Sequence, residues 1–220
     1  AASEIQVTMD DVAKVIELWT GIPAVKIRET EYAKLASLET ELKKKIIGQD
    51  DAVHLVAQAV KRSRADLSGD TLRVYLSHGG GPGINKMLEK LDIPVEFIEG
   101  LRYTSADIMR VVEMVLVGQV NTELVGFINK LGGKAVGLSG VSGDIYHCHQ
   151  RDEVHGYVGD IDYVDPKPIF AMLDAGYIPV IAPVGTDGQG HTFNINGDTA
   201  AGKLASALGA EKLVILTDIE

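Results

Sequence analysis

A run of glycines and one arginine in this chain are residue types that could hold an anionic small molecule. Gly79–Gly81 follow His78 at the end of a short apolar run, and a helical pattern begins directly after them. Glycine lets the backbone approach a ligand closely, and free amides at a helix start favour an anionic group. Arg102 adds a guanidinium that can bind a carboxylate through two hydrogen bonds. These residues suggest a site for a carboxylate or a phosphate.

Each of these residues also has a purely structural interpretation. The glycine run fits a tight turn, and Arg102 fits a surface ion pair. Asn194 and Asp198 fit a strand end and a helix N-cap, and Asp198 could serve both as a cap and as a site residue. Residue types alone leave these alternatives open.

A second polar cluster raises the question of metal or thiol chemistry. It contains His147, Cys148 and His149, with His155 nearby. Two histidines at spacing two share one face of a strand, which a zinc site can use, but no acidic or cysteine residue completes a clear ligand set. Nothing in the sequence indicates an activating environment for Cys148. We expect a solvated hairpin here, with no metal and no nucleophile.

The elements that position these residues change in character near residue 70. Residues 1–67 show the periodicity of amphipathic helices. The expected apolar faces carry Val12, Val15, Ile16 and Trp19, then Leu35, Leu38 and Leu42, then Val53, Val56 and Val60. Ser68-Gly69-Asp70 interrupts the pattern, and strands and helices alternate after it. We expect a helical segment over residues 1–70 and an α/β domain over residues 71–220.

The second domain is predicted to be a three-layer αβα sandwich with a mostly parallel sheet, because apolar strands alternate with helices. The expected strands are 72–77, 95–98, 134–138, 143–149, 156–164, 178–184, 191–195 and 212–217, and the expected helices are 83–91, 105–131 with a break near Gly118, 168–175 and 198–208. Strands 143–149 and 156–164 are expected to form an antiparallel hairpin.

Composition excludes several classes of function. The net charge of −10 disfavours a nucleic-acid partner. The single cysteine excludes an intrachain disulfide framework and fits a reducing compartment. We find no apolar run near the ~20 residues that span a bilayer and no signal-peptide pattern. We expect a cytoplasmic protein without a membrane partner.

The first segment resembles the start of the second ATPase module of Clp-type AAA+ unfoldases. The motifs are Trp19-Thr20-Gly21-Ile22-Pro23, Ile46-Ile47-Gly48-Gln49-Asp50, Ala52-Val53 and Arg62-Ser63-Arg64-Ala65. The resemblance implies an adenine contact around Ile46, Ile47 and Gly48. No phosphate loop of the form G-x-x-x-x-G-K-[ST] follows. We therefore expect no ATP hydrolysis from this segment.

From Val74 onward the sequence resembles acetylglutamate kinases, of the amino-acid kinase family. The motifs, in order, are residues 78–82 (His-Gly-Gly-Gly-Pro), 84–88 (Ile-Asn-Lys-Met-Leu), 100–104 (Gly-Leu-Arg-Tyr-Thr), 115–118 (Val-Leu-Val-Gly), 133–140 (Gly-Lys-Ala-Val-Gly-Leu-Ser-Gly), 176–181 (Gly-Tyr-Ile-Pro-Val-Ile), 194–201 (Asn-Ile-Asn-Gly-Asp-Thr-Ala-Ala) and 216–218 (Leu-Thr-Asp).

This second resemblance implies a partial amino-acid kinase fold and ATP-dependent phosphorylation of the side-chain carboxylate of N-acetyl-L-glutamate in arginine biosynthesis, with ATP and Mg²⁺. It implies that Gly80, Gly81, Arg102 and Asn194 bind substrate. It also implies that Asp198 acts in catalysis by orienting lysines. Whether the protein forms a homo-oligomer stays open.

The sequence departs from this family at both ends. The strand and Lys-x-Gly-Gly loop that supply one catalytic lysine do not precede Leu72, and the chain stops at Glu220, before the ATP lobe. Gly197 stands where the family usually has alanine. We expect the chain itself to be inactive as a kinase. The alternative is a non-catalytic chimeric fragment whose unfoldase-like helices act in protein interaction.

Overall fold

The computed structural model describes residues 37–44 and 73–216 and, in addition, positions 12, 15, 18, 53, 54, 57 and 58. Contacts divide the chain into two units, residues 1–73 with 131–133 and residues 74–130 with 134–220. The motifs of the unfoldase resemblance lie outside the described residues, apart from Val53. Thr217 and Asp218 also lie outside them.

In the first unit, residues 38–43 and positions 53, 54, 57 and 58 are helical, whereas Arg73 and residues 131–133 are not. Helix α3 spans Leu38–Lys43 and buries Leu38, while Glu39 and Lys43 form an ion pair one turn apart. Val53 and Ala57, both helical, are fully buried. Positions 12, 15 and 18 are helical too, although Val12 and Val15 are exposed rather than buried.

The second unit alternates strands and helices. Its helices are α5 (Gly81–Lys90), α6 (Ala106–Glu113), the π-helical segment η2 (Met114–Asn121), α7 (Thr122–Lys130), the 3₁₀ turn η3 (Ser142–Asp144), α8 (Lys167–Asp174) and α9 (Gly197–Ala207). Its strands are β1 (Leu76–Ser77), β2 (Phe97–Ile98), β3 (Leu101–Arg102), β4 (Ala135–Ser139), β5 (Tyr146–Gln150), β6 (Gly159–Val164), β7 (Ile178–Ala182), β8 (Val184–Thr186) and β9 (Thr192–Asn194).

Three groups of strands form the sheets. The parallel sheet has the order β1-β7-β4, with β7 in the centre and buried along its whole length. A second sheet has the order β6-β5-β8-β9, in which β5 and β6 form the predicted antiparallel hairpin. Strands β2 and β3 pair separately through a tight turn at Glu99 and Gly100, both with positive φ. Within the described residues β1 has one strand neighbour, β7.

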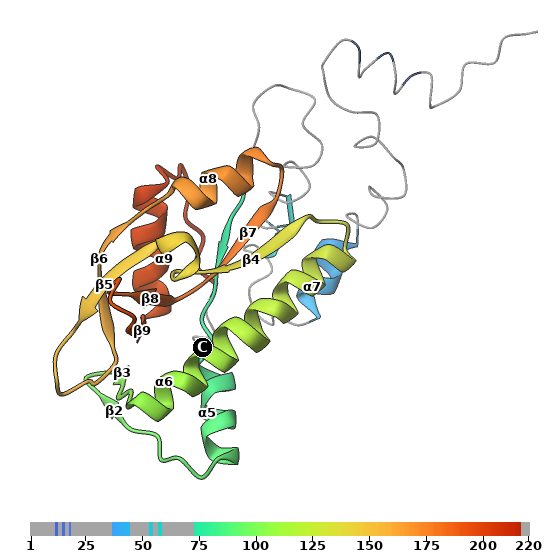
Figure 1. The fold of residues 1–220 in the computed structure, drawn as a ribbon. Helices are drawn as coiled ribbons and strands as arrows, with labels where there is room; N and C mark the ends of the chain where they lie inside the picture. Colours follow the sequence, from blue (N-terminus) through green and yellow to red (C-terminus); the bar gives the residue numbers. More distant parts are fainter. Residues whose placement is uncertain are drawn as a thin grey trace, which may run out of the picture. The chain divides into compact units, whose positions relative to one another are not determined.

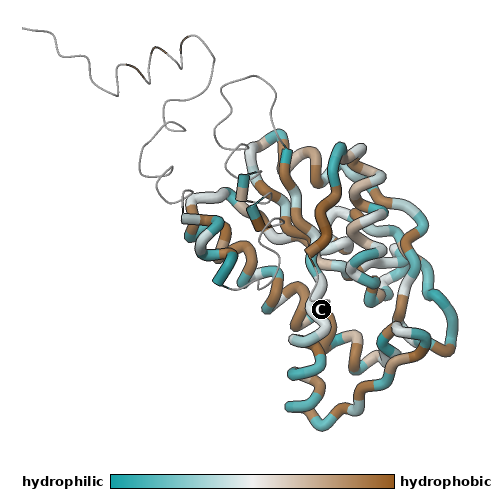
Figure 2. Tube along the Cα trace, turned by 180° about the vertical axis from the view of Figure 1, so that it is seen from behind, coloured by the Kyte–Doolittle hydropathy of each residue, from teal (hydrophilic) through white to brown (hydrophobic). Residues whose placement is uncertain are grey.

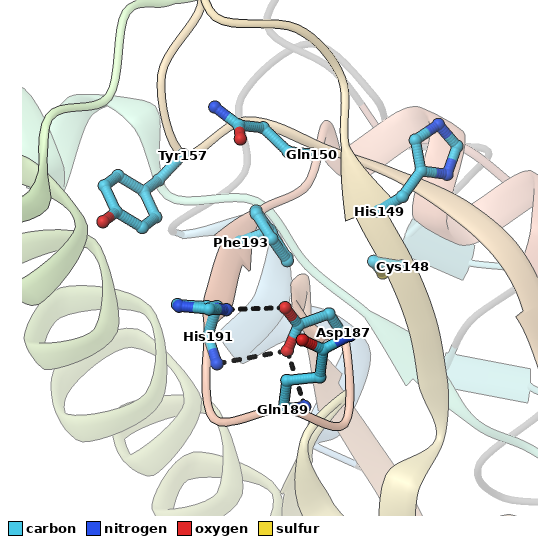
Figure 3. Close-up of a pocket in the computed structure, with 8 residues that line it drawn as sticks. All are labelled: Cys148, His149, Gln150, Tyr157, Asp187, Gln189, His191 and Phe193. Atoms are coloured by element: carbon cyan, nitrogen blue, oxygen red, sulfur yellow. Dashed lines mark hydrogen bonds and ion pairs between the residues drawn. The ribbon is translucent and has the colours of Figure 1, made fainter.

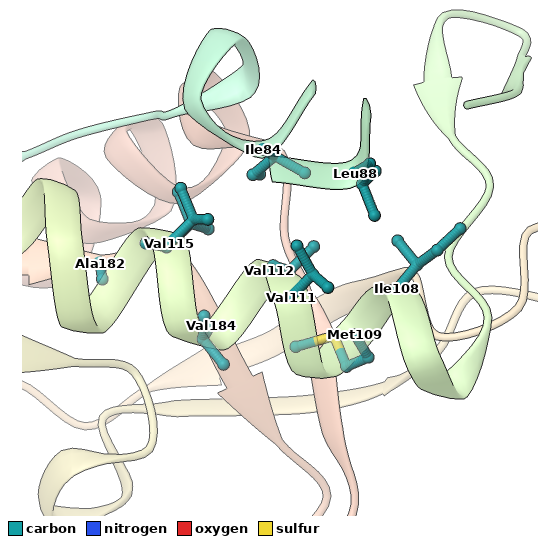
Figure 4. Packing of buried hydrophobic residues seen from close by; sticks show 10 residues of the cluster. Ile84, Leu88, Ile108, Met109, Val111, Val112, Val115, Ala182 and Val184 are labelled. Carbon is teal, nitrogen blue, oxygen red and sulfur yellow. The ribbon is translucent and has the colours of Figure 1, made fainter. Parts of the chain in front are cut away.

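Helices cover both faces of the parallel sheet, as Figure 1 shows for α6, η2 and α7 on one side and α8 and α9 on the other. Successive side chains of a strand point to opposite faces. Accordingly, Ala182 packs with α5, α6 and η2 (Figure 4), and Ile181 packs with α8 and α9. Hydrophobic residues follow the central strands in Figure 2. The predicted α/β class with a parallel sheet between helices is confirmed.

The long helix over residues 106–130 contains η2 where the sequence predicts a break near Gly118. The helix continues through this position, and eight residues take the wider π geometry. By length and composition it is apolar enough to cross a membrane, so the expectation that no apolar run reaches this length was wrong. Val112, Val115 and Leu116 are in the core, which accounts for part of that apolar character.

The predicted strands 143–149 and 156–164 begin three residues later than expected, as β5 and β6, and residues 142–144 form the turn η3 instead. Two other predicted strands differ more. The run 178–184 forms two strands, β7 and β8, that are separated by Pro183, which has no N–H to donate to a sheet. The run 212–216 is not a strand, although Leu213 and Ile215 are apolar. Both side chains are exposed, and none of the described strands pairs with this run. An apolar run forms a strand only where a neighbour accepts its hydrogen bonds.

Candidate functional site

The glycine run lies where β1 ends, at the carboxyl edge of the parallel sheet. His78 N–H donates to Ile181 O at 3.4 Å, and the chain then turns through Gly79 and Gly80 into α5. None of the backbone N–H groups of Gly79–Gly81 donates to an acceptor in the described part of the chain. Ligands of α/β proteins bind at this edge of the sheet. The loop therefore offers free amides at a helix start.

The space around the loop differs from glycine to glycine. A Cβ on Gly80 would lie 2.5 Å from Cδ2 of the buried Leu116, so a larger residue here would force that side chain to move within the core. A Cβ on Gly79 or Gly81 would meet no atom within 4 Å. The backbone at Gly79 and Gly81 is therefore open to a ligand, while Gly80 seats the loop against η2.

Hydrogen bonds of His78 and Asn121 hold the glycine run in place. Asn121 Nδ2 donates to His78 Nε2 at 3.1 Å and to Val180 O at 2.9 Å, and His78 Nδ1–H donates to Gly79 O at 2.8 Å. Burial lowers the pKa of His78, which favours the neutral ring that this pattern needs. A Cβ on Gly137 would collide with the Asn121 side chain. The sequence patterns assigned no role to His78 or Asn121; the available signal was a polar asparagine within the mostly apolar stretch of residues 114–121.

Arg102, on β3, is 93% buried by surface area, with a relative exposure of 7%. Its Nη2 lies 3.5 Å from Gly81 O, a long hydrogen bond, and its guanidinium lies 4.9 Å from the centroid of the Phe97 ring. Its Nη1 is buried without a hydrogen-bond partner, and none of the described carboxylates pairs with it. Burial lowers the pKa of Arg102, because desolvation penalises the charged form. A ligand carboxylate would supply the missing anion.

Thr104 joins Arg102 to Asn194. The Thr104 hydroxyl donates to Arg102 O at 2.9 Å, and Asn194 Nδ2 donates to the same hydroxyl oxygen at 3.2 Å. Thr104 is fully buried, and Asn194 is the last residue of β9, the strand end that the sequence suggests. Thr104 belongs to the motif at residues 100–104, but its residue type alone did not indicate this role. The structure thus brings Gly81, Arg102 and Asn194 together.

Asp198 lies in the first turn of α9 with an exposed side chain. The N-cap of this helix is Asn196, whose Oδ1 accepts from Thr199 N–H at 3.0 Å, so a capping role for Asp198 was wrong. The start of α9 reaches the glycine run, because a Cβ on Gly197 would lie 3.5 Å from Gly79 Cα. Two helix N-termini therefore converge on the loop. The catalytic role of Asp198 stays a prediction.

The residues of the histidine and cysteine cluster contact different partners and do not converge on one site. His147 stacks on Tyr163 with ring centroids 3.9 Å apart, and His149 pairs with Asp162 at 2.8 Å. Among the residues described, no three His, Cys, Asp or Glu side chains are placed to hold one metal ion. Cys148 is buried, and burial raises its pKa to about 12. A fully solvated hairpin was therefore wrong for Cys148, which is part of the core.

An open cavity of about 540 Å³ lies beside this hairpin, as Figure 3 shows. Its lining includes His149, Gln150 and Phe193 and the loop with Asp187 and His191, which form an ion pair at 2.6 Å. None of the sequence-predicted site residues lines it. The cavity is therefore separate from the glycine run and Arg102.

The second unit is thus an α/β domain in which the glycine run, at the carboxyl edge of a parallel sheet, lies beside the buried Arg102. The chain belongs to the amino acid kinase family, whose model matches residues 37–220. This match includes residues 37–70, for which the sequence predicted a different origin. The resemblance of residues 7–67 to unfoldases stays a prediction.

Several relatives are named acetylglutamate kinase. One from Acaryochloris marina is 53% identical over 148 residues, which cover 67% of this chain and 52% of the relative. One from Thermoanaerobacter sp. is 41% identical over 219 residues, which cover 96% of this chain and 68% of the relative. The crystal structure of smu.665 from Streptococcus mutans UA159 superposes with a TM-score of 0.64 at 33% identity, over 68% of this chain and 61% of that one. The chain spans about half the length of the first of these relatives.

Proposed function

We propose that this chain carries the N-acetyl-L-glutamate site of an acetylglutamate kinase, an enzyme that phosphorylates the side-chain carboxylate of this substrate in arginine biosynthesis. The observation that carries the proposal is Arg102, a buried cation beside the glycine run whose Nη1 has no partner among the described residues. N-acetylglutamate has two carboxylates, one to be phosphorylated and one left for binding. The names of the curated relatives support the choice of substrate.

Within this proposal each site residue has a role that the family resemblance implies. Arg102 binds the α-carboxylate, because a guanidinium attracts a carboxylate without reacting with it. The amides of Gly80 and Gly81 face the carboxylate that is phosphorylated, and Asn194 helps hold the acylated amino acid. Asp198 orients catalytic lysines. Phosphoryl transfer depends mainly on positioning and charge stabilisation, which such a site provides.

ATP is the phosphoryl donor that a kinase family implies, and Mg²⁺ would neutralise charge on its phosphates. The described residues fit the transferred phosphoryl group, because the backbone of Gly79 and Gly81 is open and two helix N-termini converge there. The segment Ile46–Gly48, for which an adenine contact was predicted, lies outside the described residues. A cytoplasmic location, a homo-oligomer and the inactivity of this chain as a kinase stay predictions.

Isothermal titration calorimetry with N-acetyl-L-glutamate tests the proposal. As a probe of the α-carboxylate we use N-acetyl-L-isoglutamine, in which this group is a neutral amide. We expect the substrate to bind at least about tenfold more tightly than the amide, since a charge-assisted hydrogen bond contributes about 1.5–3 kcal/mol. Arg102→Met should remove this preference.

The matched control is Arg110→Met, which removes an exposed arginine that pairs with Asp107 on α6. It should bind both compounds as the unaltered chain does. Equal affinity of the unaltered chain for the acid and the amide would overturn the assignment of Arg102.

A further inference from the structure

The loop that joins β5 and β6 is braced by its own side chains. Asp152 Oδ1 accepts from the backbone N–H of His155 at 2.8 Å, and the same carboxylate accepts from His155 Nδ1–H at 2.8 and 2.9 Å. Gln150 Nε2 closes the loop by donating to Asp152 O and to Gly156 O. The hydrogen bonds that its carboxylate accepts from the backbone and then the side chain of His155 hold the pKa of Asp152 below its usual value. These side-chain hydrogen bonds therefore help define the shape of the loop.

This braced loop is joined to Thr104 by backbone hydrogen bonds. Thr104 N–H donates to His155 O at 3.1 Å, and Tyr157 N–H donates to Thr104 O at 2.7 Å. Gly156, between them, has a φ of +68°, and a Cβ there would lie 2.4 Å from Thr104 O. The loop can approach Thr104 this closely only because residue 156 is glycine.

The same loop also contacts Asn194. Tyr157 O accepts from Asn194 N–H at 2.9 Å, while the Asn194 side chain donates to the Thr104 hydroxyl. Thr104 in turn donates to Arg102 O. The loop thus fixes the backbone of Asn194 directly and that of Arg102 through Thr104.

The ring of His155 has an unusual environment for a structural residue. Its side chain is 5% exposed, yet Nε2 is buried without a partner in the described part of the chain. An apolar residue of similar size would avoid this desolvation penalty. Leucine, however, could not donate a side-chain hydrogen bond to Asp152 as His155 does.

We propose that Asp152 and His155 are positioning residues of the substrate site: they hold segment 155–157 against Thr104 and so set the placement of Arg102 and Asn194. The inference rests on the proposed function, because the ligand it concerns is N-acetylglutamate. Neither side chain is assigned a contact with the ligand. Their effect passes through Thr104.

The test compares His155→Leu, His155→Asn and Asp152→Ala in the full chain. Leucine removes the donor to Asp152, whereas asparagine keeps an N–H that can replace it. We expect His155→Leu and Asp152→Ala to weaken N-acetylglutamate binding by about tenfold, and His155→Asn by less than about threefold, since sub-ångström placement governs such sites. Thermal stability should follow another order, with leucine at least as stable as asparagine. If affinity instead falls in step with stability, the two residues are merely structural.

His191→Leu is the matched control, because His191 also pairs with an aspartate, Asp187, but in a loop that has no hydrogen bond to Thr104. It should leave the affinity unchanged. The NMR signals of the Asn194 side-chain amide give a readout that needs no ligand. They should shift in His155→Leu and Asp152→Ala but not in His191→Leu, and unchanged signals would overturn the inference. Failure of the unaltered chain to bind N-acetylglutamate would overturn the proposed function and, with it, the role at a substrate site, whatever the signals show.

Discussion

Replacing Arg102 with methionine should stabilise the free protein while it removes the substrate site. Burying Nη1 with no hydrogen-bond partner among the described residues costs about 1–3 kcal/mol. Against this, stacking on Phe97, which is 54% exposed, contributes about 0.5–1 kcal/mol. The 3.5 Å contact with Gly81 O adds at most about 0.5 kcal/mol because it is long. The difference favours methionine, whose flexible apolar chain can fill the same space, by about 1 kcal/mol.

Urea and thermal denaturation without ligand measure this difference. For a domain of this size, 1 kcal/mol corresponds to a rise in Tm of about 2–4 °C. Buffers should contain no carboxylate or phosphate, because an anion bound at Arg102 would stabilise the unaltered protein. Arg110→Met, at an exposed and paired arginine, should change the stability by less than about 0.5 kcal/mol.

Added N-acetylglutamate should reverse the order of stability, since it stabilises only a protein that binds it. A lower Tm of Arg102→Met without ligand would refute the reasoning. It would mean that the partners of the guanidinium in the free protein outweigh its desolvation.

Further predictions concern the packing of two glycines and of Cys148. Gly80→Ala should lower the free energy of unfolding by about 1–3 kcal/mol in urea titrations, because its Cβ would collide with Leu116. Gly81→Ala should not lower it, because there is open space beside this residue. Gly197→Ala should raise the free energy of unfolding by about 0.4–1 kcal/mol, because alanine restricts the unfolded chain more than glycine does and its Cβ would lie at ordinary contact distances. A lower free energy of unfolding would contradict this packing. Cys148 should resist alkylation at pH 8 until the protein unfolds. Because burial raises its pKa from 9.0 to about 12, stability should also fall as the pH rises above 9, where only the unfolded thiol ionises.

Local sequence patterns predicted most elements of the second unit because their signals are short-range. The predicted hairpin contains β5 and β6, with both starts placed three residues too early, and the predicted helices match α8 and α9 within one residue at each end. The apolar run 212–216 shows where such patterns fail. A strand depends on a partner that the run itself does not specify.

Within the site, the sequence predicted residue types better than their connections. Gly80, Gly81 and Arg102 stood out because free amides and a guanidinium suit anions. The wrong cap assignment at Asp198 arose because Asn196, two residues earlier, offers an equivalent side-chain acceptor. Choosing between the two needs the φ and ψ values at the helix start.

The sequence by itself determined the α/β class, the glycine run and the cation for an anionic ligand, because glycine amides and a guanidinium have this chemistry in any fold. Only the tertiary structure decided that Arg102 is buried without a described partner and that Thr104 connects it to Asn194, 90 residues further along the chain. Burial and hydrogen bonds across such a separation depend on how strands pack together, and no local pattern encodes that packing.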